Sequence, residues 1–206
     1  NLYDKLNGFH PGGLYCIASR PGGCKTSLML NIALDYAKKF NKKVLIFSLE
    51  MSKREIGYRI YHIYGEDQNI MKLPIYIDDD SLVTPNKVKE KIDVVKPDIV
   101  FIDSLELLEA DTRSSARVFE ITEICYSLKR IAKSANIPVV ILSQLGGRGN
   151  DRPKLPDALR HKGSIEQDCD VIMFLYDSDY ASSPHRDFFD IEIIVAKNRW
   201  GETFTL

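Results

Sequence analysis

The sequence predicts an α/β fold, in which a mostly parallel central sheet is flanked by helices and ends in a C-terminal antiparallel hairpin. Short apolar runs alternate with stretches of helical periodicity along most of the chain, as expected of a parallel sheet covered by helices. A Gly- and Pro-containing turn joins the first apolar run to the first helical stretch. Near the C-terminus, apolar and acidic residues alternate strictly, which is typical of an antiparallel strand.

Six apolar runs are expected to form strands. They cover residues 14–18, 44–49, 75–77, 99–102, 139–142 and 171–176. Helices are expected between them: Ser52 and Glu55 have the spacing of a capping box, and Thr84-Pro85 opens a helix with proline in its first turn. The C-terminal hairpin turns around Trp200-Gly201. The longest irregular stretch, residues 145–164, is long enough to suggest a functional loop.

Composition limits the classes of protein that are possible. The chain has 206 residues, 44% of them hydrophobic and 28% charged, which fits one globular domain over residues 1–206. The formal net charge of −1 gives no overall attraction for nucleic acid, so any DNA contact needs a local basic patch. The four cysteines form no C-x-x-C pair, which favours reduced thiols in the cytoplasm over zinc. No apolar run is long enough to predict a membrane span.

The turn after the first strand has the features of a phosphate-binding Walker A loop. Its residues are Ser19, Arg20, Pro21, Gly22, Gly23, Cys24, Lys25 and Thr26. In such a loop, backbone N–H groups and a helix N-terminus point at phosphate oxygens. Lys25 would then reach the β- and γ-phosphates of ATP, and the Thr26 hydroxyl would bind Mg²⁺. The alternative is an ordinary Gly-rich turn that caps a helix.

Two residues depart from the Walker A pattern, which has glycine at both ends. Ser19 stands at the first glycine position of the pattern and Cys24 at the second glycine position. The second position is the more sensitive one, because a backbone that approaches phosphate closely can require positive φ, which is unfavourable for a residue with a Cβ atom.

Three polar residues follow predicted strands at the edge where the phosphate loop is expected. Asp103 ends an apolar strand in the manner of a Walker B acid, and it would hold Mg²⁺ mostly through water. Glu50 could polarise the water that attacks the γ-phosphate, or it could cap the next helix. Gln144 could sense the γ-phosphate, or it could be a solvated amide. Their convergence on one rim of the sheet favours an ATPase site.

Several segments resemble, in family order, the motifs of DnaB-type replicative DNA helicases. They are residues 47–52 (FSLEMS), 102–103 (ID), 142–145 (LSQL), 163–170 (GSIEQDCD), 174–176 (FLY) and 196–199 (AKNR). The segment that ends in Glu166-Gln167-Asp168 is particularly specific, because general P-loop ATPases lack it. The resemblance covers nearly the whole chain and implies the RecA-like C-terminal ATPase, or motor, domain of such a helicase.

The resemblance also implies an assembly, cofactors and partners. It implies a ring, usually a homo-hexamer, that uses ATP and Mg²⁺ to move along single-stranded DNA during replication in the cytoplasm, associated with the nucleoid. The family's N-terminal helical domain and linker, which help to hold the ring and to dock primase, are absent from residues 1–206. A primase and a helicase loader are therefore expected partners of the longer protein.

The resemblance also implies roles for individual residues. Lys25 and Thr26 would bind nucleotide and Mg²⁺, with Asp103 as the Walker B acid. Glu50 would be the catalytic carboxylate and Gln144 the switch.

A second group of family roles lies near the end of the chain. Lys197 and Arg199 match the pair that reaches the γ-phosphate of the neighbouring subunit, where an arginine finger can raise the rate by ~10³–10⁵. Without the resemblance, these two residues would be charges near a strand end on a solvated face.

The DNA contact is expected in the long irregular loop. Its candidate residues are Arg148, Arg160, His161, Lys162 and Gly163. Contacts from such a loop to phosphates would give salt-sensitive binding that tolerates any sequence. The alternative is a mobile polar loop. Three departures from the family accompany it: His161 replaces a usual Glu, Ser104 replaces a usual aromatic residue, and the segment between Met51 and Pro74 looks short.

Two other functions compete with an ATP-driven helicase motor. The first is a DnaB-like module that binds nucleotide and DNA but hydrolyses ATP poorly, because Cys24 distorts the phosphate loop. The second is another RecA-class ATPase, such as a recombinase. The 166–168 motif and the pair Lys197 and Arg199 argue against the second, and the retention of Glu50, Gln144 and Arg199 favours hydrolysis over the first.

Overall fold

A computed structural model of the protein describes residues 2–65, 69–112, 116–146, 151–155, 165–177 and 190–206. In chain order the elements are α1 (Leu2–Leu6), β1 (Leu14–Ser19), α2 (Lys25–Phe40), β2 (Val44–Ser48), α3 (Lys53–Tyr64), η1 (Ile70–Lys72), β3 (Ile75–Asp78), α4 (Pro85–Val95), β4 (Ile99–Asp103), η2 (Leu105–Leu107), α5 (Arg117–Ala135), β5 (Val139–Gln144), α6 (Ile165–Asp168), β6 (Val171–Tyr176), β7 (Glu192–Asn198) and β8 (Phe204–Thr205). All six strands expected from apolar runs are present, with ends shifted by two residues or fewer.

The strands form one sheet in the order β3-β2-β4-β5-β1-β6-β7-β8. The six strands from β3 to β6 are parallel, and β7 and β8 are antiparallel to their neighbours. This confirms the mostly parallel sheet with a C-terminal antiparallel hairpin. The carboxyl ends of the six parallel strands consequently share one edge of the sheet, where a ligand site is expected in such folds.

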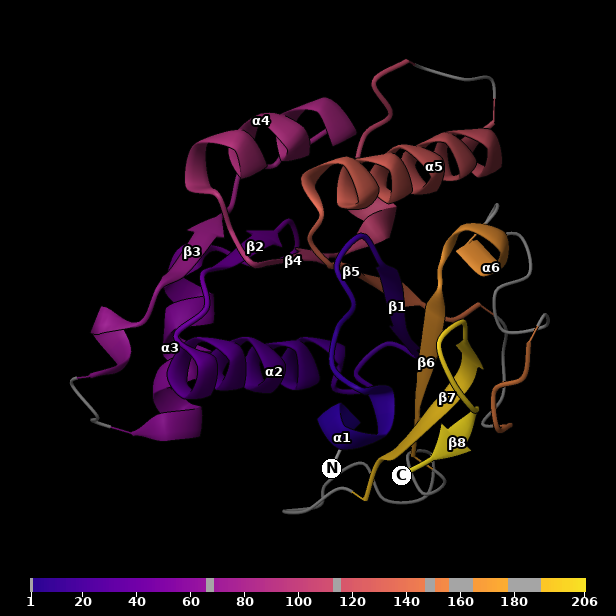
Figure 1. Ribbon diagram of the computed structural model, residues 1–206, viewed down its shortest axis with the longest axis horizontal. Coiled ribbons are helices and arrows are strands. Elements are labelled where there is room, and N and C mark those ends of the chain that lie inside the picture. The colour runs from indigo at the N-terminus through magenta and orange to yellow at the C-terminus, as the bar shows by residue number, and fades with distance from the viewer. Residues whose placement is uncertain (1, 66–68, 113–115, 147–150, 156–164, 178–189) are drawn as a thin grey trace.

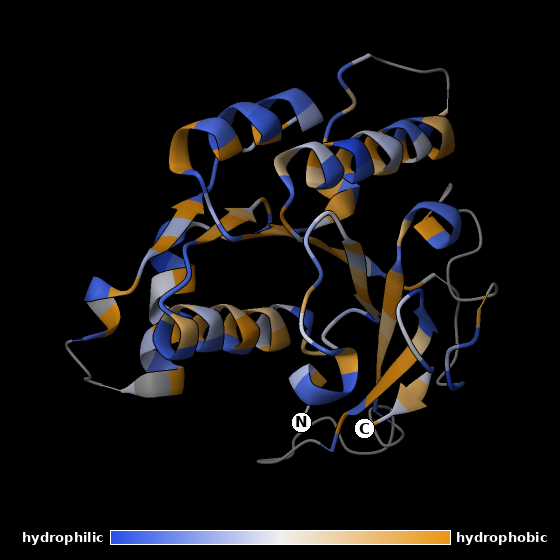
Figure 2. Cartoon of the chain, viewed as in Figure 1, coloured by the Kyte–Doolittle hydropathy of each residue, from blue (hydrophilic) through white to orange (hydrophobic). Residues whose placement is uncertain are grey.

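Helices cover both faces of the sheet (Figure 1). Successive residues of β1 alternate between two cores: Leu14, Cys16 and Ala18 pack with α4 and α5, while Tyr15 and Ile17 pack with α1, α2 and α3. The strands are apolar along most of their length because both faces are buried. Figure 2 shows this as orange strands between helices whose outer faces are blue.

Local sequence explains where the helices begin and end. Ser52 and Glu55 form the predicted capping box at α3, and the Thr84 hydroxyl accepts from the backbone N–H of Lys87 at the start of α4. Asn41 and Asn136 end α2 and α5 in the left-handed conformation, which asparagine tolerates better than most residues.

No helix in the described ranges is long and apolar enough to cross a membrane.

Candidate nucleotide site

The phosphate loop, residues 19–26, leaves the carboxyl edge of β1 and enters α2. Gly22 and Cys24 both have positive φ, 73° and 61°. The second value confirms that the Cys24 position requires the left-handed region, which costs a non-glycine residue about 1 kcal/mol or more. The loop therefore takes a glycine-like conformation although cysteine occupies its last glycine position.

Ser19 fits the loop because Gly23 has no side chain. The Ser19 hydroxyl donates to the carbonyl of Arg20 at 2.8 Å, and the backbone N–H of Gly23 donates to the same carbonyl at 3.0 Å. A Cβ atom at Gly23 would lie only 2.6 Å from Ser19 Oγ. The two departures from the Walker A pattern therefore differ: serine is accommodated without strain, and cysteine is accommodated with strain.

The N-terminus of α2 is open toward the loop. Cys24 occupies the N-cap position but makes no capping hydrogen bond with its side chain. The start of α3, in contrast, is closed by a capping box. An uncapped helix start leaves backbone N–H donors and the positive end of the helix dipole available to an anion. Lys25, only 7% exposed, makes no hydrogen bond or ion pair with the residues that the structure describes. A buried cation of this kind is suited to a phosphate ligand.

Thr26 and Asp103 meet at the carboxyl edge, as their Walker A and Walker B positions predict. The Thr26 hydroxyl donates to Asp103 Oδ2 at 2.6 Å. Asp103 is 1% exposed, and its Oδ1 has no hydrogen-bond partner among the described residues. Burial raises the pKa of Asp103 and the nearby Glu50 carboxylate adds to this, while the Thr26 hydrogen bond, Lys25 and Arg59 oppose it.

An unpartnered buried carboxylate oxygen beside a hydroxyl fits a hard cation. Mg²⁺ prefers oxygen ligands and is usually held by one or two protein groups together with phosphate oxygens and water. Thr26 and Asp103 supply such a set, and the positive charge would offset the cost of burying the Asp103 carboxylate.

Glu50 and Gln144 lie on the same edge. Glu50 follows β2 and is exposed, close enough to Asp103 to act on its pKa. Gln144 ends β5 and pairs with Ser19 of β1, so it lies beside the start of the phosphate loop. The structure thus brings together the loop, Glu50, Asp103 and Gln144 as expected.

Two residues near this edge were missed by sequence reasoning. The Glu106 carboxylate accepts from the Ser143 hydroxyl and from the backbone N–H of Gln144. Arg59, on α3, lies within electrostatic reach of Asp103 and Cys24. Their sequence signals were weak: Arg59 lies four residues after Glu55 on a helix, and Glu106 is an acidic residue in the turn after the Walker B strand.

Lys197 and Arg199 lie at the opposite edge of the sheet. Asn198 pairs with Val171, and Val171 pairs with Tyr15 near the start of β1. The phosphate loop begins four residues further along β1, roughly 13 Å away at the usual rise of a strand. These two residues are therefore not brought to the phosphate loop of their own chain.

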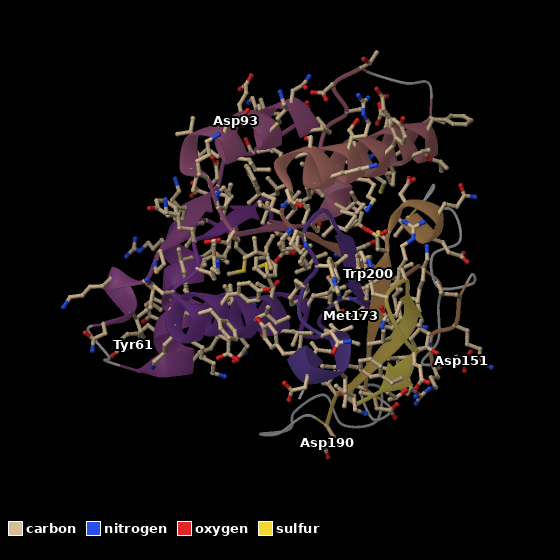
Figure 3. The ribbon with its side chains drawn as sticks, in the orientation of Figure 1. Tyr61, Asp93, Asp151, Met173, Asp190 and Trp200 are labelled. Atoms are coloured by element: carbon tan, nitrogen blue, oxygen red, sulfur yellow. The ribbon has the colours of Figure 1, made fainter. Side chains whose placement is uncertain are left out.

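Arg199 is held at that edge by a buried carboxylate. Its Nη1 donates to Asp170 Oδ1 at 2.8 Å, and Asp170 Oδ2 accepts from Lys129 Nζ at 2.5 Å and from the Leu14 backbone N–H at 2.8 Å. Asp170 is 1% exposed, while the Arg199 side chain remains 64% exposed. Lys197 donates to the carbonyl of Glu166 at 2.6 Å. Next to Arg199, Trp200 stacks on His10 at 4.5 Å, and Figure 3 places it near β7.

The DNA-binding candidates lie outside the described residues. This holds for Arg148, Arg160, His161, Lys162 and Gly163, so their expected role stays a prediction. Of the same basic loop, Arg152 is described: it pairs with Glu192 and lies over the ring of Tyr176.

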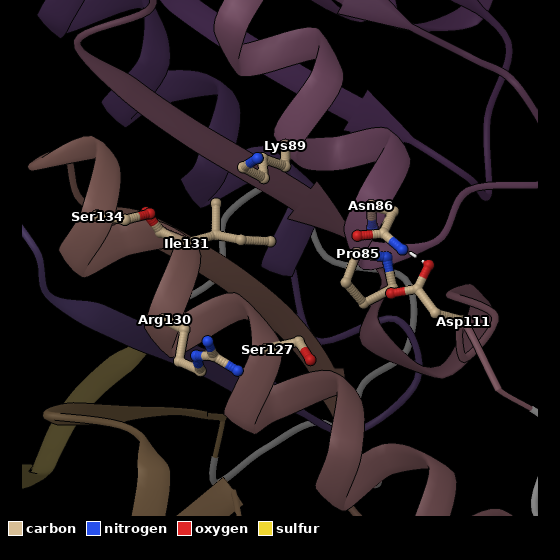
Figure 4. Close-up of a pocket in the computed structure, with 8 residues that line it drawn as sticks. All are labelled: Pro85, Asn86, Lys89, Asp111, Ser127, Arg130, Ile131 and Ser134. Atoms are coloured by element: carbon tan, nitrogen blue, oxygen red, sulfur yellow. Dashed lines mark hydrogen bonds between the residues drawn. The ribbon is translucent and has the colours of Figure 1, made fainter.

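A second hollow lies away from the phosphate loop, between α4 and α5 (Figure 4). It has a volume of about 400 Å³. Its lining residues are Pro85, Asn86, Lys89, Asp111, Ser127, Arg130, Ile131 and Ser134. Most of these side chains are polar and exposed, so the groove is open surface, and its lining includes none of the phosphate-loop or strand-end residues described above.

The fold and the carboxyl edge together define a P-loop nucleotide-binding domain of the RecA-like class. Comparison with known proteins gives the family. The family model of the DnaB-like helicase C-terminal domain matches residues 1–66 and 60–206. The chain belongs to this family.

Individual relatives agree. The chain is 36% identical to a probable replicative DNA helicase of Trieres chinensis, over all of this chain and 53% of the relative. It is 35% identical to the replicative DNA helicase DnaB of Geobacillus stearothermophilus, over 97% of this chain and 51% of the relative. The chain thus spans about half the length of these relatives.

Solved structures give the same fold. A DnaB-like replicative helicase, solved for its interactions with primase, has a TM-score of 0.87 and 30% identity over all of this chain and 57% of its own. A solved ATPase domain has a TM-score of 0.86 and 28% identity over all of this chain and 84% of its own.

The comparisons also bear on the segment that looked short. The Trieres alignment runs over 241 positions against 206 residues here, so the relative carries residues that this chain lacks. The two matches to the family model overlap at residues 60–66, within the segment between Met51 and Pro74.

Proposed function

We propose that residues 1–206 form a single ATPase domain that drives a replicative helicase along single-stranded DNA. The observation that carries this proposal is the carboxyl edge, where a buried Lys25, an uncapped helix start and the Thr26–Asp103 pair converge. These are the groups that bind a nucleoside triphosphate and its Mg²⁺ in P-loop proteins.

The roles of the residues follow from their positions. Backbone N–H groups of the loop and Lys25 would neutralise the β- and γ-phosphates. Mg²⁺, held by Thr26 and Asp103, would supply further charge neutralisation on the phosphates. Glu50 would take a proton from the attacking water as its oxygen bonds to the γ-phosphorus and the bond to the ADP oxygen breaks. Gln144 would report the presence of the γ-phosphate through its amide.

Arg199 and Lys197 would act on the nucleotide of a neighbouring copy. They lie at the edge opposite to their own phosphate loop, so only a second subunit could place them at a γ-phosphate. Such a site would be completed by assembly, and hydrolysis would depend on the ring. A homo-hexamer of the longer protein is consistent with this requirement for head-to-tail contacts.

The partners are single-stranded DNA, a primase and a helicase loader, with the protein acting at the nucleoid. Relatives named as replicative helicases and a neighbour solved with regard to primase support DNA and primase. The basic loop that includes Arg148, Arg160, His161, Lys162 and Gly163 remains the proposed DNA contact.

A DnaB-like module with impaired hydrolysis is less well supported. Cys24 takes the left-handed conformation that a glycine would take, and the Thr26–Asp103 hydrogen bond forms beside it. The cysteine therefore costs conformational energy without displacing the groups that bind the metal and phosphates.

Strand displacement tests the proposal. The full-length protein should separate a forked DNA duplex with ATP and Mg²⁺, and the Lys25→Ala variant should not. Separation that is equally fast with the variant, or that proceeds without ATP, would contradict the proposal. DNA-independent nucleotide hydrolysis by the wild type would favour a different RecA-class ATPase.

A further inference from the structure

Glu106 joins the end of the Walker B strand to the end of β5. It lies in the short turn η2, three residues after Asp103. Its Oε1 accepts from Ser143 Oγ at 2.6 Å and from the backbone N–H of Gln144 at 2.9 Å. One carboxylate oxygen therefore holds two successive residues of the strand that carries the proposed γ-phosphate sensor.

The turn that carries Glu106 is itself fixed from the other side. Arg117, the first residue of α5, donates through Nη2 to the carbonyls of Glu106 at 3.0 Å and Leu108 at 2.5 Å. The backbone N–H of Glu109 donates to the carbonyl of Val83 at 3.0 Å. The Glu106 side chain thus projects from an anchored turn toward β5.

This contact begins where the strand pairing stops. The pairing between β4 and β5 ends at Ile102 and Ile141, so no ladder hydrogen bond joins Asp103 to the last residues of β5. Ser143 is fully buried, and a buried hydroxyl needs a hydrogen-bond partner. Glu106 supplies that partner and continues the link between the two strands at the site edge.

We infer that Glu106 is a positioning residue that sets the orientation of Gln144 toward the γ-phosphate. The inference rests on the proposed function, in which Gln144 is the sensor. With the Gln144 backbone fixed, its side chain has fewer arrangements to lose when phosphate binds. Without Glu106, the Ser143 hydroxyl and the Gln144 N–H lose a common partner, and the end of β5 keeps its pairing with β1 but loses its link to the turn after β4.

Loss of the Glu106 contact should affect the rate of hydrolysis rather than nucleotide binding. Misplacement of a catalytic group by about 1 Å can lower the rate by about 100-fold. Nucleotide binding depends mainly on the phosphate loop, whereas the Glu106 carboxylate accepts hydrogen bonds from Ser143 and Gln144 of β5. We therefore expect loss of the Glu106 carboxylate to lower kcat and to change KM for ATP little.

Three variants of the full-length protein test this, in ATP hydrolysis with and without single-stranded DNA. Glu106→Ala should lower the DNA-stimulated kcat by about tenfold or more and change KM for ATP little. Glu106→Gln retains an acceptor oxygen at the same place and should restore most of the rate. Glu109→Ala removes a nearby exposed carboxylate and should behave like the wild type.

Each outcome decides the inference. A wild-type kcat in Glu106→Ala overturns it, and so does a Glu106→Gln variant as slow as Glu106→Ala. If Glu106→Ala fails to fold, the single variants Ser143→Ala and Glu106→Gln take its place. Ser143→Ala removes one of the two donors, so it should lower kcat, but by less than the loss expected of Glu106→Ala. A wild-type protein that hydrolyses no ATP while still binding it would instead refute the proposed function.

Discussion

The Thr26 hydroxyl donates to the Asp103 carboxylate at 2.6 Å although the two residues are 77 positions apart in the chain. The bond connects the first turn of α2 to the end of β4, so it joins the two parts of the proposed Mg²⁺-nucleotide site. The second oxygen of Asp103 is buried and has no partner in the described part of the chain. A cation at this place would satisfy it.

Thr26→Ala should weaken binding of the Mg²⁺ complex of ATP by at least about tenfold, because a metal ligand and the contact to Asp103 are both lost. Binding of ATP in the presence of a chelator should change much less. Calorimetric titration with and without Mg²⁺ measures both affinities. Thr122→Ala on α5 is the control, and an equal loss of affinity with and without Mg²⁺ would speak against metal binding by Thr26.

Asp103→Asn should make the ligand-free protein more stable and abolish Mg²⁺-dependent binding. The pKa of the Asp103 carboxyl is raised above its ordinary 3.8, chiefly by burial. Between 3.8 and the raised value, the folded state binds more protons than the unfolded state, so the free energy of unfolding falls as pH rises. Asparagine removes this dependence.

Thermal unfolding measures that effect. At pH 7 without Mg²⁺, the asparagine variant should melt roughly 2–4 °C higher, which corresponds to about 1 kcal/mol in a domain of this size. Mg²⁺-ATP should stabilise the wild type more than ATP with a chelator does, and the variant should show no added effect of Mg²⁺. A variant that melts lower at pH 7 would show that burial does not penalise the carboxylate.

Cys24→Gly should preserve or raise ATP hydrolysis. The left-handed conformation at φ 61° costs a residue with a Cβ about 1 kcal/mol, while glycine adds entropy of about 0.4–1 kcal/mol to the unfolded chain. Stability should therefore change by less than about 1 kcal/mol. The matched variant Gly23→Ala should lower nucleotide affinity strongly, because its Cβ would collide with Ser19. A large loss of activity in Cys24→Gly would show that the thiol itself is needed.

Arg199→Ala should abolish hydrolysis, by about 10³-fold or more, with nucleotide binding largely intact. On the proposed action of Arg199 in trans, mixing this variant with Lys25→Ala should form some sites with both residues present. Hydrolysis by the mixture, measured against each variant alone, checks this. Full activity of a monomeric protein would rule out a trans-acting arginine.

Much of the fold could be predicted from the sequence, because its strands are buried on both faces and read as short apolar runs. The meeting of residues 19–26 with Asp103 could be predicted as well, because strands 14–19 and 99–103 end at the same edge of the sheet. The surroundings of Asp170 could not. Its partners Leu14, Lys129 and Arg199 come from three elements with no periodic signal to connect them.

The contacts of Glu106 at the proposed site could not be predicted from the sequence either. An acidic residue after a Walker B strand could face solvent, and only the register of β5 against β4 brings Ser143 and Gln144 to it. Contacts between side chains of distant elements depend on the packed structure. Local patterns specify the elements and the polar strand ends, but not which polar groups meet.

Steady-state ATP hydrolysis by the full-length protein, with and without single-stranded DNA, is the most direct test of the central claim. The wild type should hydrolyse ATP faster with DNA, Lys25→Ala should show no hydrolysis, and the control Lys133→Ala, on the outer face of α5, should match the wild type. DNA-stimulated hydrolysis that persists in Lys25→Ala, or tight Mg²⁺-ATP binding with no turnover in the wild type, would contradict the account.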